Sequence, residues 1–181
     1  MRLFVGLSIP RSVAEGIFLI QAGVPGARWQ TREQLHLTLR FIGEVDGRDG
    51  NAIDEMLSAI SAPTFTLELR GVGEFGGKNP HAIWAGVRDA APLKHLNRKI
   101  ENAIQRIGLP ADERKFTPHV TLARLRGSPR ERVIDYLADH ALYASPAFDV
   151  NEFILYSSTL TPNGSLYVPE RVYPLKQGAN P

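Results

Sequence analysis

The sequence predicts an α+β protein built from one structural unit used twice. Apolar strand segments alternate with amphipathic helices, and the order strand, helix, strand, helix occurs in both halves. The second strand of each unit carries a His-x-Thr motif. No long linker separates the halves, so we expect a single domain over residues 1–181. Two similar lobes related by a pseudo-two-fold axis would bring the motif strands face to face.

The first half contains the elements of one unit in order. Residues 2–9 predict a buried strand, and Ser12 is the expected N-cap of the next helix, with Glu15 as its capping-box partner. The strand at 35–42 carries the first motif. A second helix is indicated by apolar residues at helical spacing, namely Ile53, Met56, Leu57 and Ile60. Residues 64–70 alternate strictly and predict a half-exposed strand.

The second half restarts this order. Residues 82–87 predict a strand, and a helix follows with Pro92 in its first turn and Gly108 after its end. The apolar residues of this helix are Leu93, Leu96, Ile100, Ala103, Ile104 and Ile107. The strand at 119–125 carries the second motif, and Ser128 is the expected N-cap of the helix after it.

Two extended runs end the sequence. Residues 148–156 predict a strand, and Asn163-Gly164 is a typical hairpin turn. Earlier in the chain, the glycines of "GVGEFGG" (71–77) have the spacing of a dinucleotide-binding loop. Because a strand rather than a helix follows them, we expect only a glycine-rich loop between strands.

Composition and charge exclude several kinds of site. The sequence has no cysteine, which excludes disulfides, thiolate catalysis and cysteine-bound metal and fits a cytoplasmic location. No apolar run is long enough for a membrane span, and we expect no signal peptide. The net charge is only +2, but residues 114–132 hold six Arg and Lys against one Glu. This local charge of +5 is either a solvated face or an anion-binding surface.

The two motifs each place an imidazole beside a hydroxyl. Side chains alternate across a strand, so His36 and Thr38 share one face, as do His119 and Thr121. One such histidine is usually structural, but two in matching positions favour a shared site. Two histidines can give and take protons near neutral pH, and hydroxyls can bind charged oxygens. This chemistry is typical of a site for a phosphodiester.

A metal site is the alternative use of two histidines. Zinc needs a third and usually a fourth protein or water ligand at suitable spacing. Neither motif has an accompanying His-x₃-His or His-x-Asp pattern, and the remaining histidines, His81, His95 and His140, share no repeated context. We therefore expect no metal and no other cofactor.

The motifs "HLTL" (36–39) and "HVTL" (119–122) resemble the paired HxTx signature of the 2H phosphoesterases. More narrowly, the chain resembles the RNA 2′,3′-cyclic phosphodiesterases of bacteria and archaea, also called 2′-5′ RNA ligases. The similarity extends over "RLFVGLSIP", "LHLTLRFIGEV", "FTPHVTLARL" and "LYSSTLTPNGSLYVPERVYPL". It implies a bilobal fold of two intertwined lobes, in which two antiparallel sheets face a central cleft and helices pack outside.

The resemblance also implies an activity and roles for the motif residues. The activity is metal-independent hydrolysis of RNA 2′,3′-cyclic phosphodiester ends to 2′-phosphomonoesters. His36 would be the proton donor and His119 the proton acceptor, while Thr38 and Thr121 would bind the phosphate.

Two arginines are candidates for a further phosphate contact. The family's arginine after the second motif falls on Arg124, but strict alternation places Arg124 opposite His119. By the same rule Arg40 shares the face of His36, so both remain candidates. Phe41 and Phe116 are candidates for stacking on a base, with a core position as the alternative.

The expected partners are RNA with a 2′,3′-cyclic phosphate end, including tRNA fragments, or small cyclic nucleotides. We expect a monomer that does not associate with membranes. One alternative is 2′-5′ RNA ligation by the reverse step, and another is RNA-end binding without catalysis. Hydrolysis is favoured because no separate module is present to hold a second RNA end, and binding alone would not require both histidines.

Overall fold

The main feature of the computed structural model, which describes residues 1–178, is a sheet with the strand order β10-β9-β1-β3-β7-β6-β5, with β2 beside β7. One half of the sheet, called the β3 half, consists of β1 (Arg2–Ser8), β3 (His36–Glu44), β9 (Glu152–Thr161) and β10 (Gly164–Pro174). The β7 half consists of β2 (Ala27–Trp29), β5 (Leu69–Phe75), β6 (Ala82–Val87) and β7 (Val120–Leu125). Neighbouring strands are antiparallel, and the predicted α+β class is confirmed.

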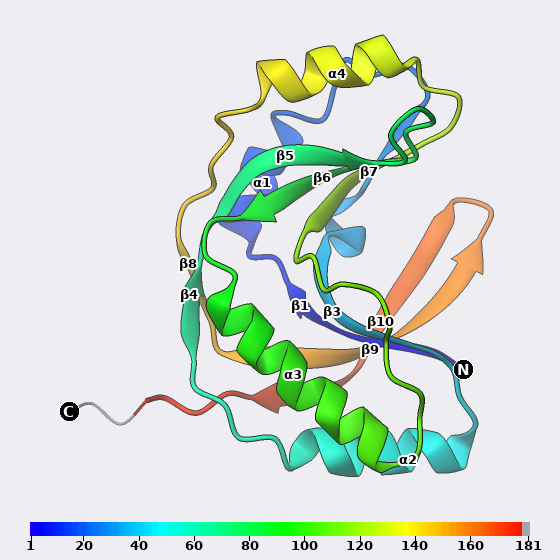
Figure 1. Cartoon of the computed structure of the whole chain (residues 1–181), viewed down its shortest axis with the longest axis vertical. Helices are drawn as coiled ribbons and strands as arrows, with labels where there is room; N and C mark the ends of the chain where they lie inside the picture. Colours follow the sequence, from blue (N-terminus) through cyan, green and yellow to red (C-terminus); the bar gives the residue numbers. More distant parts are fainter. Residues whose placement is uncertain (179–181) are drawn as a thin grey trace.

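The two halves of the sheet meet at one residue pair. Leu37 of β3 pairs with Val120 of β7, and both side chains are 0% exposed. Beyond this pair the two halves diverge, so that β3 and β7 form the two inner sides of an open V (Figure 1). The two expected sheets are thus two arms of a sheet joined at a single point.

Helices cover the outer sides of both arms. Helix α3 (Ala91–Arg106) packs on β3 and on α2 (Gly47–Ser58), while α4 (Arg130–Asp139) packs on β5 (Figure 1). Helix α1 (Arg11–Phe18) is tied to α4, because the Tyr136 hydroxyl donates to the carbonyl of Ile20 at 2.7 Å. No helix within residues 1–178 has the length and apolar character needed to cross a membrane.

Helix α3 joins the two repeats. It follows a strand of the second repeat in sequence, yet it packs against the motif strand of the first. Its buried residues are Leu93, Leu96, Ile100, Ala103 and Ile104, as the helical spacing predicted. The main core is accordingly one cluster that includes residues of both arms, among them Leu37, Leu122 and Ile100.

Two predicted helix caps were wrong. Helix α1 begins at Arg11 with Pro10 at the N-cap position, so Ser12 lies inside the helix. Helix α4 likewise begins at Arg130 with Pro129 as N-cap, and Ser128 lies one residue too early. In both cases the φ of –60° that the proline ring imposes suits the start of a helix, and this outweighed the serine signal.

Two predicted strands are each divided. Residues 64–70 split into β4 (Phe65–Leu67), which pairs with β8 (Phe148–Val150), and β5, which pairs with β6. Residues 148–156 split between β8 and β9 in the same way. The glycines expected in a loop lie partly in β5, where a Cβ on Gly73 would clash with the Trp84 ring. This close packing of a ring on backbone requires glycine.

Because the two arms of the sheet meet at a single residue pair, stability should depend strongly on the side chains of that pair. Leu37→Ala should lower the free energy of unfolding by about 2–5 kcal/mol, because it leaves a cavity where β3, β7 and α3 meet. Leu160→Ala, at a side chain that is 73% exposed on β9, is the matched control and should change it by less than about 0.5 kcal/mol. Urea unfolding measures both values, and equal effects would contradict the importance of the joint.

Candidate active site

The pair Leu37–Val120 sets the two motifs against each other. Because β3 and β7 are antiparallel, one step along the register places His36 across from Thr121 and Thr38 across from His119. Thr38 and His119 also line the same cavity, which has a volume of about 690 Å³. The structure therefore brings together the four residues of two motifs that lie 83 positions apart in the sequence.

The two histidine rings are held in the same way. The Nδ1 atom of His36 is 2.7 Å from the carbonyl oxygen of Gln34, and that of His119 is 2.6 Å from the carbonyl oxygen of Thr117. Each Nδ1 must donate its proton to this carbonyl, so in the neutral ring Nε2 is the free base. His36 Nε2 is 3.1 Å from the Thr38 hydroxyl. Proton exchange with a substrate is thus restricted to Nε2 of each ring.

A β-bulge follows the threonine in each motif. Val5 and Gly6 of β1 pair with Arg40 and Thr38, so Leu39 is the extra residue in β3. Ile83 and Trp84 of β6 pair with Ala123 and Thr121, so Leu122 is the extra residue in β7. A bulge shifts the alternation of side chains by one residue. The burial of adjacent residues, Leu39 with Arg40 and Leu122 with Ala123, reflects this shift.

The bulges decide which arginine faces the motif histidines. The shift turns Arg124 to the face of Thr121, which strict alternation did not allow. It also turns Phe41 to the face of His36, where Phe41 packs against the cluster that contains Phe4. The positive charge of Arg124 lowers the pKa of both histidines, so its guanidinium lies within electrostatic reach of both.

Arg40 lies on the opposite face and is occupied by protein groups, which corrects its expected position beside His36. It is 6% exposed, and its Nε donates to Glu101 Oε2 at 2.5 Å. Its remaining nitrogens donate to the carbonyl oxygens of Phe41 and, at 2.6 Å, Pro110. These contacts fix β3 to α3 and to the segment after it.

Side-chain amides bind the carbonyl oxygen of each bulged residue. Asn97 Nδ2 on α3 donates to the Leu39 carbonyl at 2.7 Å. Gln21 Nε2, just after α1, donates to the Leu122 carbonyl at 3.3 Å, and the backbone N–H of Gln30 donates to the same oxygen at 2.8 Å. Each bulge is therefore held by hydrogen bonds to the carbonyl oxygen of its extra residue.

The histidines differ in their surroundings. The His36 ring packs on Phe4 and edge-on against Tyr167, with ring centroids 4.9 and 4.7 Å apart. Burial lowers the pKa of His36 to about 4, against the opposing effect of its bond to the Gln34 carbonyl. Burial also lowers the pKa of His119, although this half-buried ring has a more open setting, edge-on to Phe75 at 4.9 Å. Both rings are therefore neutral in the free protein at pH 7.

The cavity beside the motifs has aromatic and basic walls. Phe41, Phe75 and Phe116 line it, together with Arg114 and Lys115. The other residues that line it are Thr38, Leu39, Arg40, Gly76, His81, Asn97, Glu101, Asp112, Thr117 and His119. Within residues 1–178, no group of three or more His, Cys, Asp or Glu side chains is placed to hold a metal ion. The arrangement offers proton exchange and hydrogen bonding to an anion beside a cavity whose lining includes three phenylalanines.

Comparisons with known proteins agree with this site. A family model of the 2′-5′ RNA ligase superfamily matches residues 14–161. The RNA 2′,3′-cyclic phosphodiesterase of Archaeoglobus fulgidus is 31% identical over 177 residues, 96% of this chain and 99% of that protein. The chain belongs to the 2′-5′ RNA ligase superfamily of 2H phosphoesterases. The Escherichia coli protein of the same name as the archaeal one is 30% identical, with 97% of each chain covered.

Solved structures place this 2H phosphoesterase in the same fold. A crystal structure of a Thermus thermophilus protein matches with a TM-score of 0.84 and 25% identity, covering 99% of this chain and 100% of the other. Escherichia coli LigT complexed with 3′-AMP matches with a TM-score of 0.80 and 28% identity, covering 97% and 98%. The predicted family and fold are confirmed.

Sequence reasoning missed the residues that support the site of this 2H phosphoesterase. Gln34, Gln21 and Asn97 act through amide or carbonyl groups, and nothing in the local sequence marks Gln21 or Asn97. Gln34 alone had a signal, since it precedes the motif histidine by two residues, as Thr117 precedes the other. Together these residues tie the motif strands to α1, α3 and the β9–β10 hairpin, where Gln34 Nε2 donates to the Ser165 carbonyl at 3.1 Å.

The position of Arg124 predicts a change in histidine titration. Arg124→Gln removes a cation that disfavours both imidazolium ions, so the pKa values of His36 and His119 should rise. NMR titration of the ring protons measures them without any need for activity. Arg126→Gln, which removes a charge that acts on neither ring, is the control. Unchanged pKa values in Arg124→Gln would place this side chain away from the site.

The contact of Asn97 with the bulge in β3 predicts a cost for its removal. Asn97→Leu should lower the free energy of unfolding by about 1–3 kcal/mol, because the Leu39 carbonyl loses this donor. Asn102→Leu, at an exposed position on the same helix, is the control. Chemical denaturation compares the two variants, and equal effects would contradict this account.

Proposed function

We propose that the chain hydrolyses 2′,3′-cyclic phosphodiester ends of RNA to 2′-phosphomonoesters without a metal. The observation that carries the proposal is the pair of histidines on two strands that meet at Leu37–Val120. In each ring Nδ1 is bound to a backbone carbonyl, so Nε2 is the atom that can exchange a proton with a substrate. Relatives over nearly the whole chain are named RNA 2′,3′-cyclic phosphodiesterase, which supports the same activity here.

The reaction needs one base and one acid. Neutral His119 accepts a proton from water at Nε2 as the water oxygen forms a bond to phosphorus. The bond from phosphorus to the ribose O3′ breaks, and His36 donates a proton to O3′ from its Nε2. The products are a free 3′-hydroxyl and a 2′-phosphomonoester. After the reaction His119 is protonated and His36 is neutral. Proton exchange with solvent restores the starting state.

The substrate itself must help to charge the acid. With a pKa of about 4, His36 is almost entirely neutral at pH 7 in the free protein. A bound phosphodiester brings a negative charge beside the ring, and an adjacent anion favours the imidazolium ion. The proton therefore reaches His36 with the substrate or just after the substrate binds. Without a bound anion, the aromatic surroundings of His36 disfavour its protonation.

The threonines and Arg124 bind the charged oxygens in this proposal. Thr38 and Thr121 stand across from the opposite histidines, so each hydroxyl can donate to a non-bridging oxygen while the facing Nε2 meets a bridging or attacking oxygen. Arg124 adds a positive charge on the same face. Arg40 does not, because its guanidinium is bound to Glu101. Hydroxyls and one guanidinium suffice for a singly charged phosphodiester.

The wider setting belongs to the same proposal. The chain acts as a monomer and as one domain over residues 1–181, made of two intertwined lobes that each hold one motif. Its substrates are RNA ends with a cyclic phosphate, tRNA fragments among them, or small cyclic nucleotides. A cytoplasmic location fits the absence of cysteine from the sequence.

Removal of either motif histidine tests the mechanism. His36→Ala and His119→Ala should each lower kcat by at least about 10²-fold on an oligonucleotide with a 2′,3′-cyclic phosphate, measured in EDTA. The reason is that acid and base act in one step. His95→Ala, on the exposed side of α3, is the matched control and should retain full activity. Thermal unfolding of each variant separates loss of function from loss of fold.

The same assay distinguishes the alternatives. Near-normal turnover by His119→Ala would reject the two-histidine mechanism. Activity lost in EDTA and restored by a divalent ion would move the protein to a metal-dependent class. Joined RNA ends as the main product would indicate ligation, and binding without turnover by the unmodified chain would reject the enzyme altogether.

A further inference from the structure

Arg28 and Arg124 are direct cross-strand partners on β2 and β7. Paired residues of antiparallel strands point to the same face, with Cβ atoms about 4.5–5.5 Å apart. The bulge at Leu122 turns Arg124 to the face of Thr121 and His119. Arg28, whose side chain is exposed, must therefore point to that face as well.

Neither guanidinium group forms an ion pair with another residue of the range 1–178. Like charges directly opposite each other on neighbouring strands repel and destabilise the sheet. The ion pairs found within residues 1–178 involve other arginines, and neither Arg28 nor Arg124 takes part in one. Two adjacent cations beside a phosphate site, with no carboxylate between them, match an anionic ligand better than a structural role.

Arg28 and Arg124 differ in their surroundings. The charge of Arg124 lowers the pKa of both His36 and His119, whereas Arg28 affects neither. The Arg28 guanidinium instead lies beside the β9–β10 turn, where a Cβ on Gly164 would be 3.6 Å from its Cζ. The two arginines thus offer two neighbouring positions for negative charge, one at the histidines and one toward the hairpin.

We infer that Arg28 binds a second phosphate of the substrate, the one on the 5′ side of the terminal nucleoside, while Arg124 contacts the reacting cyclic phosphate. The inference rests on the proposed function, because RNA carries one phosphate per nucleotide and the nearest second anion is this 5′-phosphate. A guanidinium matches phosphate oxygens with paired hydrogen bonds. The preferred substrate class is then a nucleotide with phosphate on both sides, such as an RNA end, rather than a nucleoside 2′,3′-cyclic phosphate.

Two small substrates isolate this contact. One is a nucleoside 2′,3′-cyclic phosphate, and the other is the same molecule with an added 5′-phosphate. The unmodified protein should have the higher kcat/KM for the second. Arg28→Gln should reduce this preference about tenfold, the usual effect of losing one hydrogen bond to a charged group. Arg28→Lys, which keeps the charge but not the paired geometry, should retain part of the preference.

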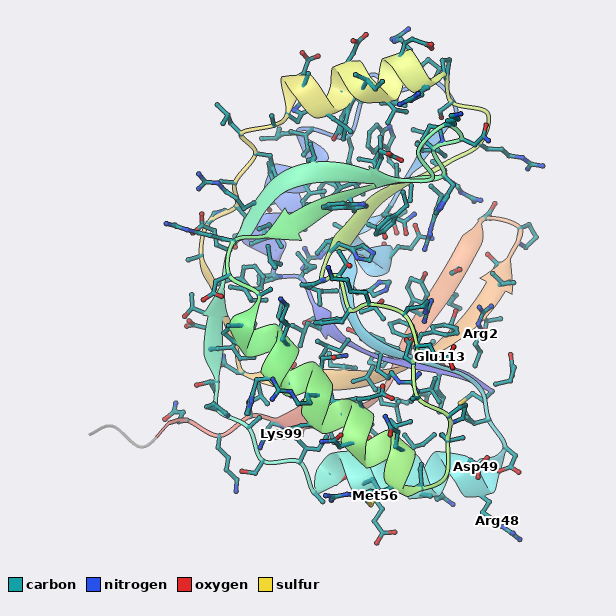
Figure 2. The ribbon with its side chains drawn as sticks, in the orientation of Figure 1. Arg2, Arg48, Asp49, Met56, Lys99 and Glu113 are labelled. Atoms are coloured by element: carbon teal, nitrogen blue, oxygen red, sulfur yellow. The ribbon has the colours of Figure 1, made fainter. Side chains whose placement is uncertain are left out.

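The control removes the same charge elsewhere. Arg48 lies at the outer end of α2 and points away from the molecule (Figure 2), so Arg48→Gln should keep the preference. Arg28→Gln with an undiminished preference would overturn the inference. An equal loss on both substrates would also overturn it, since Arg28 would then act on the reacting phosphate or on the fold. If the unmodified protein hydrolyses neither substrate, the proposed function fails, and calorimetric binding of the two molecules to both variants still decides whether Arg28 recognises the 5′-phosphate.

Discussion

The site depends on a single backbone contact between two arms of a sheet. Leu37 and Val120 pair at the apex of the V, fully buried beneath α3 and the rest of the main core. Because the pairing ends there, the motif side chains that flank it are half-buried on the inner face and are not covered by further strand. A longer ladder between β3 and β7 would close the space in which a substrate must lie, and no ladder at all would leave the motifs without a fixed relative position.

The bulges adapt two ordinary strands to this purpose. In a regular strand every second side chain lies on the inner face, so residue number alone would decide which side chains after each motif face the site. The extra residues Leu39 and Leu122 shift that pattern, so Phe41 and Arg124 follow the threonines on the inner face. The bulge in β3 thus places an aromatic ring, Phe41, on the inner face, and the bulge in β7 places a cation, Arg124, there. Amide side chains keep both bulges in place.

The electrostatics of the site are unfavourable without a ligand. Two arginines are cross-strand neighbours, and neither forms an ion pair within the described residues 1–178. Burial and a nearby positive charge lower the pKa of both imidazoles. Negative charge beside these groups would relieve the repulsion between the guanidinium groups and would favour protonation of a histidine. The charges of the site therefore match an anionic ligand.

The sequence by itself determined the elements, the duplicated order and the four motif residues, because helical spacing, strand alternation and a repeated His-x-Thr are local patterns. It also identified the family, whose signature consists of the same motifs. The tertiary structure decided what depends on pairing between distant segments. Strict alternation predicts that Arg40 lies on the inner face and Arg124 on the outer face. The register of β1 with β3 and of β6 with β7 shows two bulges that reverse both positions. Asn97, Gln21 and Arg28 have no local signature, since each acts on a partner that folding alone brings near.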